Sequence, residues 1–439
     1  MPKKTKIIFI IVFILVGSIM LGFYFYVSKK NTSGTNSGSN NAYQPFLGGN
    51  TTPQGGNGNS TSSNNTSGTQ TNTPIDSQVA PQASKFHQIT NISVAGAAYL
   101  EDTRKVQTTG VALPGGLTQP TSTTKTTTKV AAPRVETVPS VRYVERATGY
   151  IDEMYLDTKV SGEISNSTIP SIYRAFFGND ANSVIYQYLS PDTGDTINSF
   201  MATLGGSKGE FLPSNVINIS LSPDKSKFFY LVKTSSGVNG IVRSFGDTKA
   251  SQVFSSRYSE WLSQWVTKDK VFLTTKASSA VDGSVFSLNI ISGISTKIFG
   301  SVKGLTTLAN NDGSLILYST SDSSVPQLKI FNTKNRTTFD LNTPGLAEKC
   351  IWSADNINIY CAIPSNIIGG DYPDSWYQGL VSFNDRFAKI NSITGDQIDI
   401  ADSTNEIAVD ATKLFLNKDE SQLFFINKKD STLWSLDLN

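Results

Sequence analysis

The sequence repeats one short turn six times. In each copy an apolar segment runs into a polar turn with one aspartate, and a second apolar segment follows, as in Leu221-Ser222-Pro223-Asp224 before residues 228–232. The six aspartates are Asp180, Asp224, Asp269, Asp312, Asp355 and Asp419, spaced by 43 to 45 residues except for the last interval of 64. A period in the low forties with several strands in each repeat is typical of the blades of a β-propeller.

The apolar patterns around the turns predict four strands in each blade. Second strands such as 228–232 are apolar without alternation, as expected where neighbouring blades cover both faces. Third strands such as 286–290 alternate apolar and polar residues. We therefore predict an all-β, seven-bladed propeller of four-stranded antiparallel blades over residues 86–439, with a low-complexity insertion at about 105–140.

The last blade has segments for only three strands before the sequence ends. Residues 86–90, Phe-His-Gln-Ile-Thr, have the character of a strand and lie at the opposite end of the propeller region. A strand from one terminus that completes the blade of the other closes the ring and hides an exposed sheet edge. We therefore expect this segment to be the fourth strand of blade seven.

The first 85 residues do not have the composition of a propeller. Residues 1–6 are basic, and residues 7–27 hold no charged residue over a length of about 31 Å, close to the thickness of a bilayer. Residues 28–85 are rich in Ser, Thr, Asn and Gly, a composition that predicts a disordered linker. The interpretation is a cytoplasmic tail, a single-pass transmembrane signal anchor and a tether for an extracytoplasmic domain. A cleaved signal peptide is the alternative, but no small-residue cleavage site follows the apolar run.

Composition excludes several classes of function. The chain has 37 Lys and Arg against 35 Asp and Glu, and five of the lysines lie at the N-terminus, at positions 3, 4, 6, 29 and 30. The remainder has no basic excess, so we expect no nucleic-acid partner. The single histidine, His87, leaves no basis for a Ser-His-Asp or Cys-His nucleophile or for a common zinc site. We expect no cofactor and no metal.

The two cysteines, Cys350 and Cys361, lie on the first and second strands expected for blade six. If the hairpin between them is centred between Asp355 and Asn356, they are directly opposed, which suits a disulfide in an oxidising compartment. A register shift of one residue would put them on opposite faces and leave two buried thiols.

The turns at Leu221-Ser222-Pro223-Asp224 and Trp352-Ser353-Ala354-Asp355 resemble those of TolB-type, WD-like β-propellers of bacterial envelopes. The resemblance covers residues 86–439, although only one copy keeps Ser-Pro-Asp and only one keeps Asp-Gly. The arrangement of basic start, anchor, linker and propeller is also similar to membrane-anchored surface proteins of small-genome bacteria. The resemblance implies a platform for protein binding and supplies no catalytic residue.

A loop in blade six is the strongest candidate for ligand binding. It carries two acidic and three aromatic residues, which are Asp371, Tyr372, Asp374, Trp376 and Tyr377. Aromatic residues on a loop of a rigid scaffold are common in recognition sites. Two alternatives stay open: the aromatic residues pin the loop to the blade, or Asp371 and Asp374 hold calcium, although their spacing matches no known calcium loop.

Other acidic residues have a structural interpretation. The turn aspartates are expected to accept hydrogen bonds from nearby turn amides. The charged residues of Glu145-Arg146 and Asn384-Asp385-Arg386 are expected to form internal or surface salt bridges.

The sequence thus favours a non-catalytic binding or scaffold module at the cell membrane, with an envelope protein or polysaccharide as its partner. A propeller hydrolase that cleaves glycans or peptides through carboxylates in the central channel is the alternative. A self-associating component of a surface layer is a third possibility.

Overall fold

A computed structural model describes residues 84–106, 134–178, 181–206, 209–322, 324–403 and 407–439. These residues belong to one compact unit, residues 79–439. The predicted tail (1–6), anchor (7–27) and nearly all of the predicted linker (28–85) lie outside the described residues. Within the described part of the chain, no helix has the length and apolar character needed to cross a membrane.

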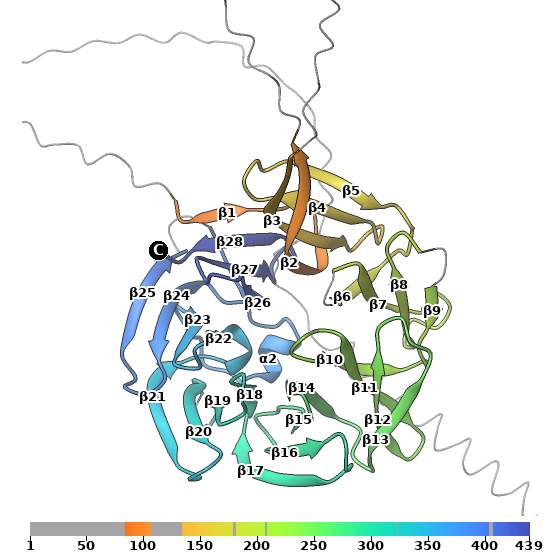
Figure 1. Cartoon of the computed structure of the whole chain (residues 1–439). Helices are drawn as coiled ribbons and strands as arrows, with labels where there is room; N and C mark the ends of the chain where they lie inside the picture. The colour runs from red at the N-terminus through yellow and green to blue at the C-terminus, as the bar shows by residue number, and fades with distance from the viewer. Residues whose placement is uncertain (1–83, 107–133, 179–180, 207–208, 323, 404–406) are drawn as a thin grey trace, which may run out of the picture. The chain divides into compact units, whose positions relative to one another are not determined.

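The described strands form seven four-stranded antiparallel sheets, which Figure 1 shows arranged around a common centre. The predicted seven-bladed architecture is therefore confirmed. Blade one contains β2 (Val94–Val106), β3 (Arg134–Glu145), β4 (Ile151–Tyr155) and β5 (Ser161–Ser165). Blade two contains β6 (Ile172–Phe177), β7 (Ser183–Leu189), β8 (Ile197–Thr203) and β9 (Gly209–Phe211). Blade three contains β10 (Val216–Leu221), β11 (Lys227–Thr234), β12 (Gly237–Ser244) and β13 (Ala250–Ser256).

The remaining blades follow the same meander. Blade four contains β14 (Trp261–Thr267), β15 (Lys270–Thr275), β16 (Asp282–Asn289) and β17 (Ser295–Lys303). Blade five contains β18 (Thr306–Ala309), β19 (Leu315–Thr320), β20 (Gln327–Asn332) and β21 (Thr338–Pro344). Blade six contains β22 (Cys350–Trp352), β23 (Asn358–Pro364), β24 (Asp385–Asn391) and β25 (Gln397–Asp402), with the short helices η1 (Ala347–Lys349) and α2 (Asp374–Tyr377) in its loops. Blade seven contains β26 (Ala411–Leu416), β27 (Gln422–Asn427), β28 (Leu433–Asp437) and β1 (Phe86–Gln88).

Residues 86–88 close the ring as the sequence predicted. Strand β1 pairs with β28 in antiparallel register, with Phe86 opposite Leu436 and Gln88 opposite Trp434. The Phe86 ring is buried and lies edge-on against Phe387 of blade six, with 5.6 Å between the ring centroids. The first strand in the described chain thus completes the last blade and also contacts its neighbour.

The hydrophobic core lies between the blades. Seven clusters of buried residues each join two neighbouring blades, and one of them joins blade seven to blade one through Phe424 and Tyr143. Second strands such as β19 and β27 are buried along nearly their whole length, because a neighbouring blade covers each face. The interfaces are continuous around the ring, so each blade depends on two others.

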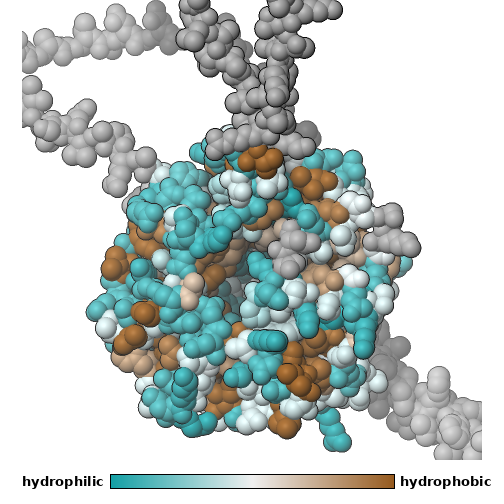
Figure 2. Space-filling view, viewed as in Figure 1, coloured by the Kyte–Doolittle hydropathy of each residue, from teal (hydrophilic) through white to brown (hydrophobic). Residues whose placement is uncertain are grey.

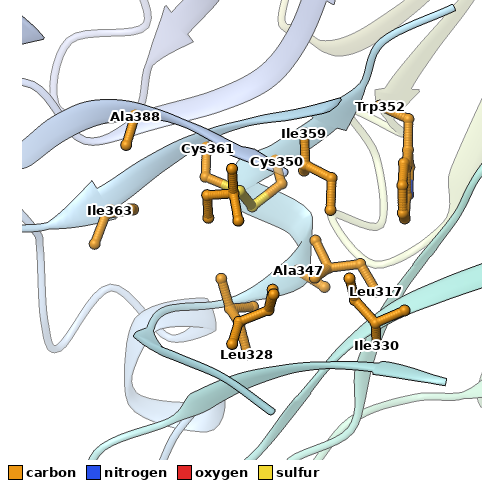
Figure 3. Close-up of a cluster of buried hydrophobic side chains, with 12 residues drawn as sticks. Leu317, Leu328, Ile330, Ala347, Cys350, Trp352, Ile359, Cys361, Ile363 and Ala388 are labelled. Atoms are coloured by element: carbon orange, nitrogen blue, oxygen red, sulfur yellow. A yellow bond between two sulfur atoms is a disulfide. The ribbon is translucent and has the colours of Figure 1, made fainter. Parts of the chain in front are cut away.

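The cluster between blades five and six contains a disulfide. Cys350 and Cys361 are direct partners in the pairing of β22 with β23, and their Cα atoms are 4.1 Å apart. Figure 3 shows the sulfur bridge among Leu317, Leu328 and Ala347. The register is the one that a hairpin centred between Asp355 and Asn356 requires.

The insertion in blade one is shorter than expected. Strands β2 and β3 form one long hairpin that stays paired as far as Val106 and Arg134, so residues at both ends of the predicted 105–140 segment are strand. Residues 107–133 lie outside the described residues. The sequence pattern missed these strand ends because Thr and Val are common both in this low-complexity stretch and in β-strands.

Candidate functional site

The repeated aspartates stabilise the turns that carry them. The side chains of Asp224, Asp312, Asp355 and Asp419 each accept a backbone N–H bond from a residue two positions ahead. Hydrogen bonds from the Ser222 and Ser226 hydroxyls lower the pKa of Asp224 to about 2. Asp269 accepts a bond from the Thr267 hydroxyl, and Asp180 lies outside the described residues. These carboxylates are therefore occupied by their own turns.

The blade-six loop packs its aromatic residues inward. It connects β23 to β24 and contains α2, which Figure 1 draws near the centre of the ring. Tyr372 and Trp376 are 0% and 4% exposed and stack on Phe383 at centroid distances of 5.7 and 6.1 Å. The Tyr372 hydroxyl donates to the backbone oxygen of Ile368. Both rings therefore anchor the loop and present little surface to a ligand.

A buried ionic group holds this loop against blade seven. The Lys349 ammonium lies 2.8 Å from Asp385 and 2.6 Å from Asp410, and all three side chains are fully buried. Asp410 also accepts bonds from the Trp376 indole N–H and the Phe383 backbone N–H. Burial alone would raise the pKa of Asp410, but Lys349 and these donors bring it below its usual value. Burial raises the pKa of Asp385 to about 6 despite Lys349.

The other predicted residues of the loop also have partners within the protein. Asp374 accepts a bond of 2.6 Å from the backbone N–H of Ser279 in blade four. The Tyr377 hydroxyl donates to the Glu348 carboxylate, and Asp371 is exposed. The structure therefore does not bring Asp371 and Asp374 into a metal site with a third ligand, and the described residues contain no group of three or more His, Cys, Asp or Glu side chains placed to hold a metal.

A groove in blade four lies at the same end of the propeller as α2. The 276–281 and 365–384 connections both join the second strand of a blade to the third, so the meander puts them at one end. The groove has a volume of 660 Å³ and is lined by Tyr258, Trp261, Val281 and Phe286. The Tyr258 and Val281 side chains are 75% and 64% exposed. Its rim is charged, with Arg257, Glu260, Lys276, Asp282 and Lys297.

The aromatic residues of this groove form a supported stack. The Trp261 ring is buried and lies edge-on against Phe254, Phe286 and Tyr258, with centroid distances of 5.8, 5.4 and 6.4 Å. The Trp261 indole N–H donates to the backbone oxygen of Tyr258 at 2.9 Å. The exposed Tyr258 is thus the outermost member of a rigid arrangement, which lowers the entropy that a ligand contact would cost.

A second cavity lies in the central channel. It has a volume of 430 Å³ and is lined mainly by residues of the first strands of four blades, β2, β6, β10 and β26, which lie beside the centre in Figure 1. Its charged lining residues are Arg174, Lys225 and Lys413, all three exposed, and its lining includes no carboxylate. Desolvation of the Lys413 ammonium inside the channel, with Arg174 and Arg146 nearby, lowers the pKa of Lys413 to about 7.

The surface offers no single large apolar face in the view of Figure 2. Hydrophobic residues there form separate patches among hydrophilic ones.

No protein-family model matches the sequence, and no curated protein matches it significantly. Solved structures do match. An oligogalacturonate lyase in complex with manganese is 12% identical over 79% of this chain and 99% of its own, with a TM-score of 0.47. An oligogalacturonate lyase from Vibrio parahaemolyticus is 8% identical with the same two coverages and the same TM-score of 0.47. TolB from Acinetobacter baumannii is 10% identical over 68% of this chain and 76% of its own, with a TM-score of 0.39.

The likeness to these proteins is one of fold. TolB, the kind of propeller that the turns at Asp224 and Asp355 resemble, is among them. Because the matches include lyases as well as TolB, they carry no argument about enzymatic activity.

Sequence reasoning missed both cavities. Tyr258 and Trp261 flank a strand start in a segment that has no repeat signal, and the channel cations come from strands far apart in the sequence. The period of the turns predicted the strands of each blade, but it did not identify which side chains face the channel.

Proposed function

We propose that this protein is a non-catalytic binding module, tethered to the membrane outside the cytoplasm, whose ligand is an envelope protein or polysaccharide. The observation that carries the proposal is the blade-four groove, where the exposed Tyr258 and Val281 adjoin a charged rim. An aromatic centre with a polar edge is the usual composition of a protein recognition site.

The blade-six loop lies at the same end of the propeller as the groove and contacts the segment that lines it. Asp374 fixes the backbone at Ser279, two residues before the groove residue Val281. Tyr372 and Trp376 hold the loop through their burial, and Asp371 is its exposed acidic residue. We propose that the loop forms one wall of a face that continues into the groove.

The alternative of a propeller hydrolase needs two carboxylates facing a substrate. The channel cavity has three cations in its lining and no carboxylate. Asp385 and Asp410 are near each other, but both are fully buried and share the Lys349 ammonium. Neither the channel cavity nor this buried pair offers two carboxylates to a substrate, so we advance the binding module.

The test is photo-cross-linking on intact cells with the full-length protein as bait, followed by analysis of recovered proteins and polysaccharides. We expect the Tyr258→Ala variant to lose the partner that the unmodified protein recovers, because a central tyrosine contributes about 2 kcal/mol or more at such sites. Phe211→Ala is the matched control, since Phe211 is an exposed aromatic residue, 65% exposed, in blade two.

Equal recovery with Tyr258→Ala and Phe211→Ala would contradict the proposed groove. Recovery of nothing but the bait would instead favour the surface-layer alternative, in which copies of the chain associate with one another.

A further inference from the structure

The channel cavity is lined by three cations and by no carboxylate. Arg174 belongs to β6, Lys413 to β26 and Lys225 to the turn after β10. Among the described residues, none of the three lies in an ion pair. The Lys413 ammonium donates one bond, of 2.8 Å, to the backbone oxygen of Ala95.

Buried cations elsewhere in the propeller do have carboxylate partners. Arg142 pairs with Glu153 at 2.8 Å, and Lys349 pairs with Asp385 and Asp410. Removing a charge from water without a partner is costly, and folded proteins avoid it. Arg174, Lys225 and Lys413 are instead exposed, so an anion that enters the cavity meets three cations and no carboxylate among the lining residues.

The rest of the lining restricts the kind of anion. Phe176, Phe177, Leu221 and Phe415 line the same cavity, together with the small residues of β2. These walls suit an apolar body, whereas a bare phosphate or sulfate would leave them in contact with water. An arginine guanidinium presents two parallel N–H groups that match a carboxylate.

We propose that the central channel is a ligand site, distinct from the blade-four groove, that binds a carboxylate attached to an apolar group between Arg174 and Lys413. The carboxylate accepts hydrogen bonds from these two side chains, while the apolar part contacts the phenylalanines. The source is a free organic acid or the C-terminal carboxylate of a peptide, which share this chemistry.

The charges around Lys413 add a pH dependence. Arg174 on β6, Arg146 in the turn after β3 and Lys225 at the cavity edge are cations near it. The Glu348 carboxylate, which accepts a bond from the Tyr377 hydroxyl, lies within electrostatic reach of Arg174. Because desolvation and the neighbouring arginines lower the pKa of Lys413 to about 7, the empty site loses a charge above neutral pH. A bound carboxylate stabilises the protonated amine, so binding weakens as the pH rises from 6 to 8.

The experiment is titration calorimetry on the purified full-length chain with 3-phenylpropanoate, its neutral analogue 3-phenylpropanamide, and inorganic phosphate. We expect the acid to bind, and the amide and phosphate to bind at least about tenfold more weakly, because a hydrogen bond to a charged group is worth about 1.5–3 kcal/mol. Arg174→Gln and Lys413→Gln should each weaken binding of the acid by a similar factor. Lys413→Arg should keep binding and lose its dependence on pH.

Lys249→Gln is the control, since Lys249 is an exposed lysine outside the channel and should leave binding unchanged. The peptides acetyl-Ala-Ala-Phe acid and its C-terminal amide distinguish the sources: a peptide acid that binds more tightly than 3-phenylpropanoate identifies a peptide terminus, and the reverse order identifies a free acid. The proposal would be overturned if 3-phenylpropanamide or inorganic phosphate bound as tightly as 3-phenylpropanoate. It would also be overturned if Arg174→Gln and Lys413→Gln bound 3-phenylpropanoate with wild-type affinity. Failure of the Tyr258 test has no bearing on these outcomes.

Discussion

At the scale of the residue, Asp410 does most to fix the blade-six loop. One carboxylate accepts bonds from Lys349, the Trp376 indole and the Phe383 backbone, so side chains from three segments meet at one buried anion. The Lys428 ammonium lies 4.4 Å from the Trp376 ring centroid on the other side. Electrostatic contacts of this kind are strong in a buried site, and the loss of any one partner leaves a buried charge unpaired.

Lys349→Met tests this group. The substitution keeps most of the side-chain volume but leaves Asp385 and Asp410 buried without a cation, which typically costs about 3–5 kcal/mol of unfolding free energy. Burial then raises the pKa of both carboxyls above the unfolded value. A carboxyl whose pKa is raised in the folded state favours folding at low pH, where it is protonated, and opposes folding at high pH, where it must ionise while buried. The loss of unfolding free energy relative to wild type should therefore be larger at pH 8 than at pH 5.

Urea unfolding at the two pH values measures the effect. Lys418→Met is the control, because Lys418 is 74% exposed and pairs with Glu101 at the surface, where such pairs contribute about 1 kcal/mol or less. A loss that is the same for both variants would argue against the ionic group.

The sequence predicted that Asp385 and Arg386 take part in salt bridges, and they do so with different partners. Adjacent residues of a strand point to opposite faces, so Asp385 meets the buried Lys349 and Arg386 meets Asp399 on the surface. The partners are 36 residues before Asp385 and 13 residues after Arg386, and neither follows from a local pattern. The salt bridges predicted for Glu145 and Arg146 are not found among the described residues: Glu145 accepts a bond from the Thr148 hydroxyl, and Arg146 donates to the Ser431 hydroxyl.

At the scale of the element, β1 is one of the shortest strands of the described chain, yet it closes the ring. It has three residues, and it supplies the outer edge of blade seven from the other end of the propeller sequence. Phe86 reaches into the interface with blade six, whereas His87 lies at the surface, 2.9 Å from Asp437. The strand therefore closes the sheet by backbone pairing and the core by a single aromatic residue.

Phe86→Ala should lower the unfolding free energy by about 3 kcal/mol, the cost of removing a buried phenylalanine. His87→Ala, on the same strand, should cost less than about 1 kcal/mol because its ion pair is partly exposed. Chemical denaturation of both variants provides the comparison. Similar values for the two would mean that β1 contributes through its backbone alone.

Elements with a periodic signal were predictable, and the blade-six loop was not. The turn aspartates and the apolar second strands repeat, so the number of blades and the closing strand follow from the sequence. The register at Cys350 and Cys361 was one of two that the sequence left open, and the structure decides it. The direction of Trp376 depends on where Asp410 lies, 34 residues later. The aromatic residues were expected to meet a ligand, or to pin the loop, and only the tertiary contacts distinguish these roles.

At the scale of the whole molecule, the ring makes the blades depend on one another. Seven clusters of described residues join each blade to both of its neighbours, and one of them joins blade seven to blade one. The groove and the channel cavity share no lining residue. The two proposed sites can therefore be tested independently by substitution.

The proposed tether can be tested with trypsin on intact cells. Residues 31–84 contain no Lys or Arg, and Lys29, Lys30 and Lys85 bracket them, so cleavage at these three positions would separate the propeller from residues 7–27. If the propeller lies outside the membrane, trypsin should release a folded fragment that begins at Asn31 or Phe86, while a cytoplasmic marker stays intact. The same fragment must appear when cells are lysed before treatment, which shows that the sites are open to the protease. Full protection in intact cells combined with cleavage after lysis would reverse the proposed orientation and put both ligand sites in the cytoplasm.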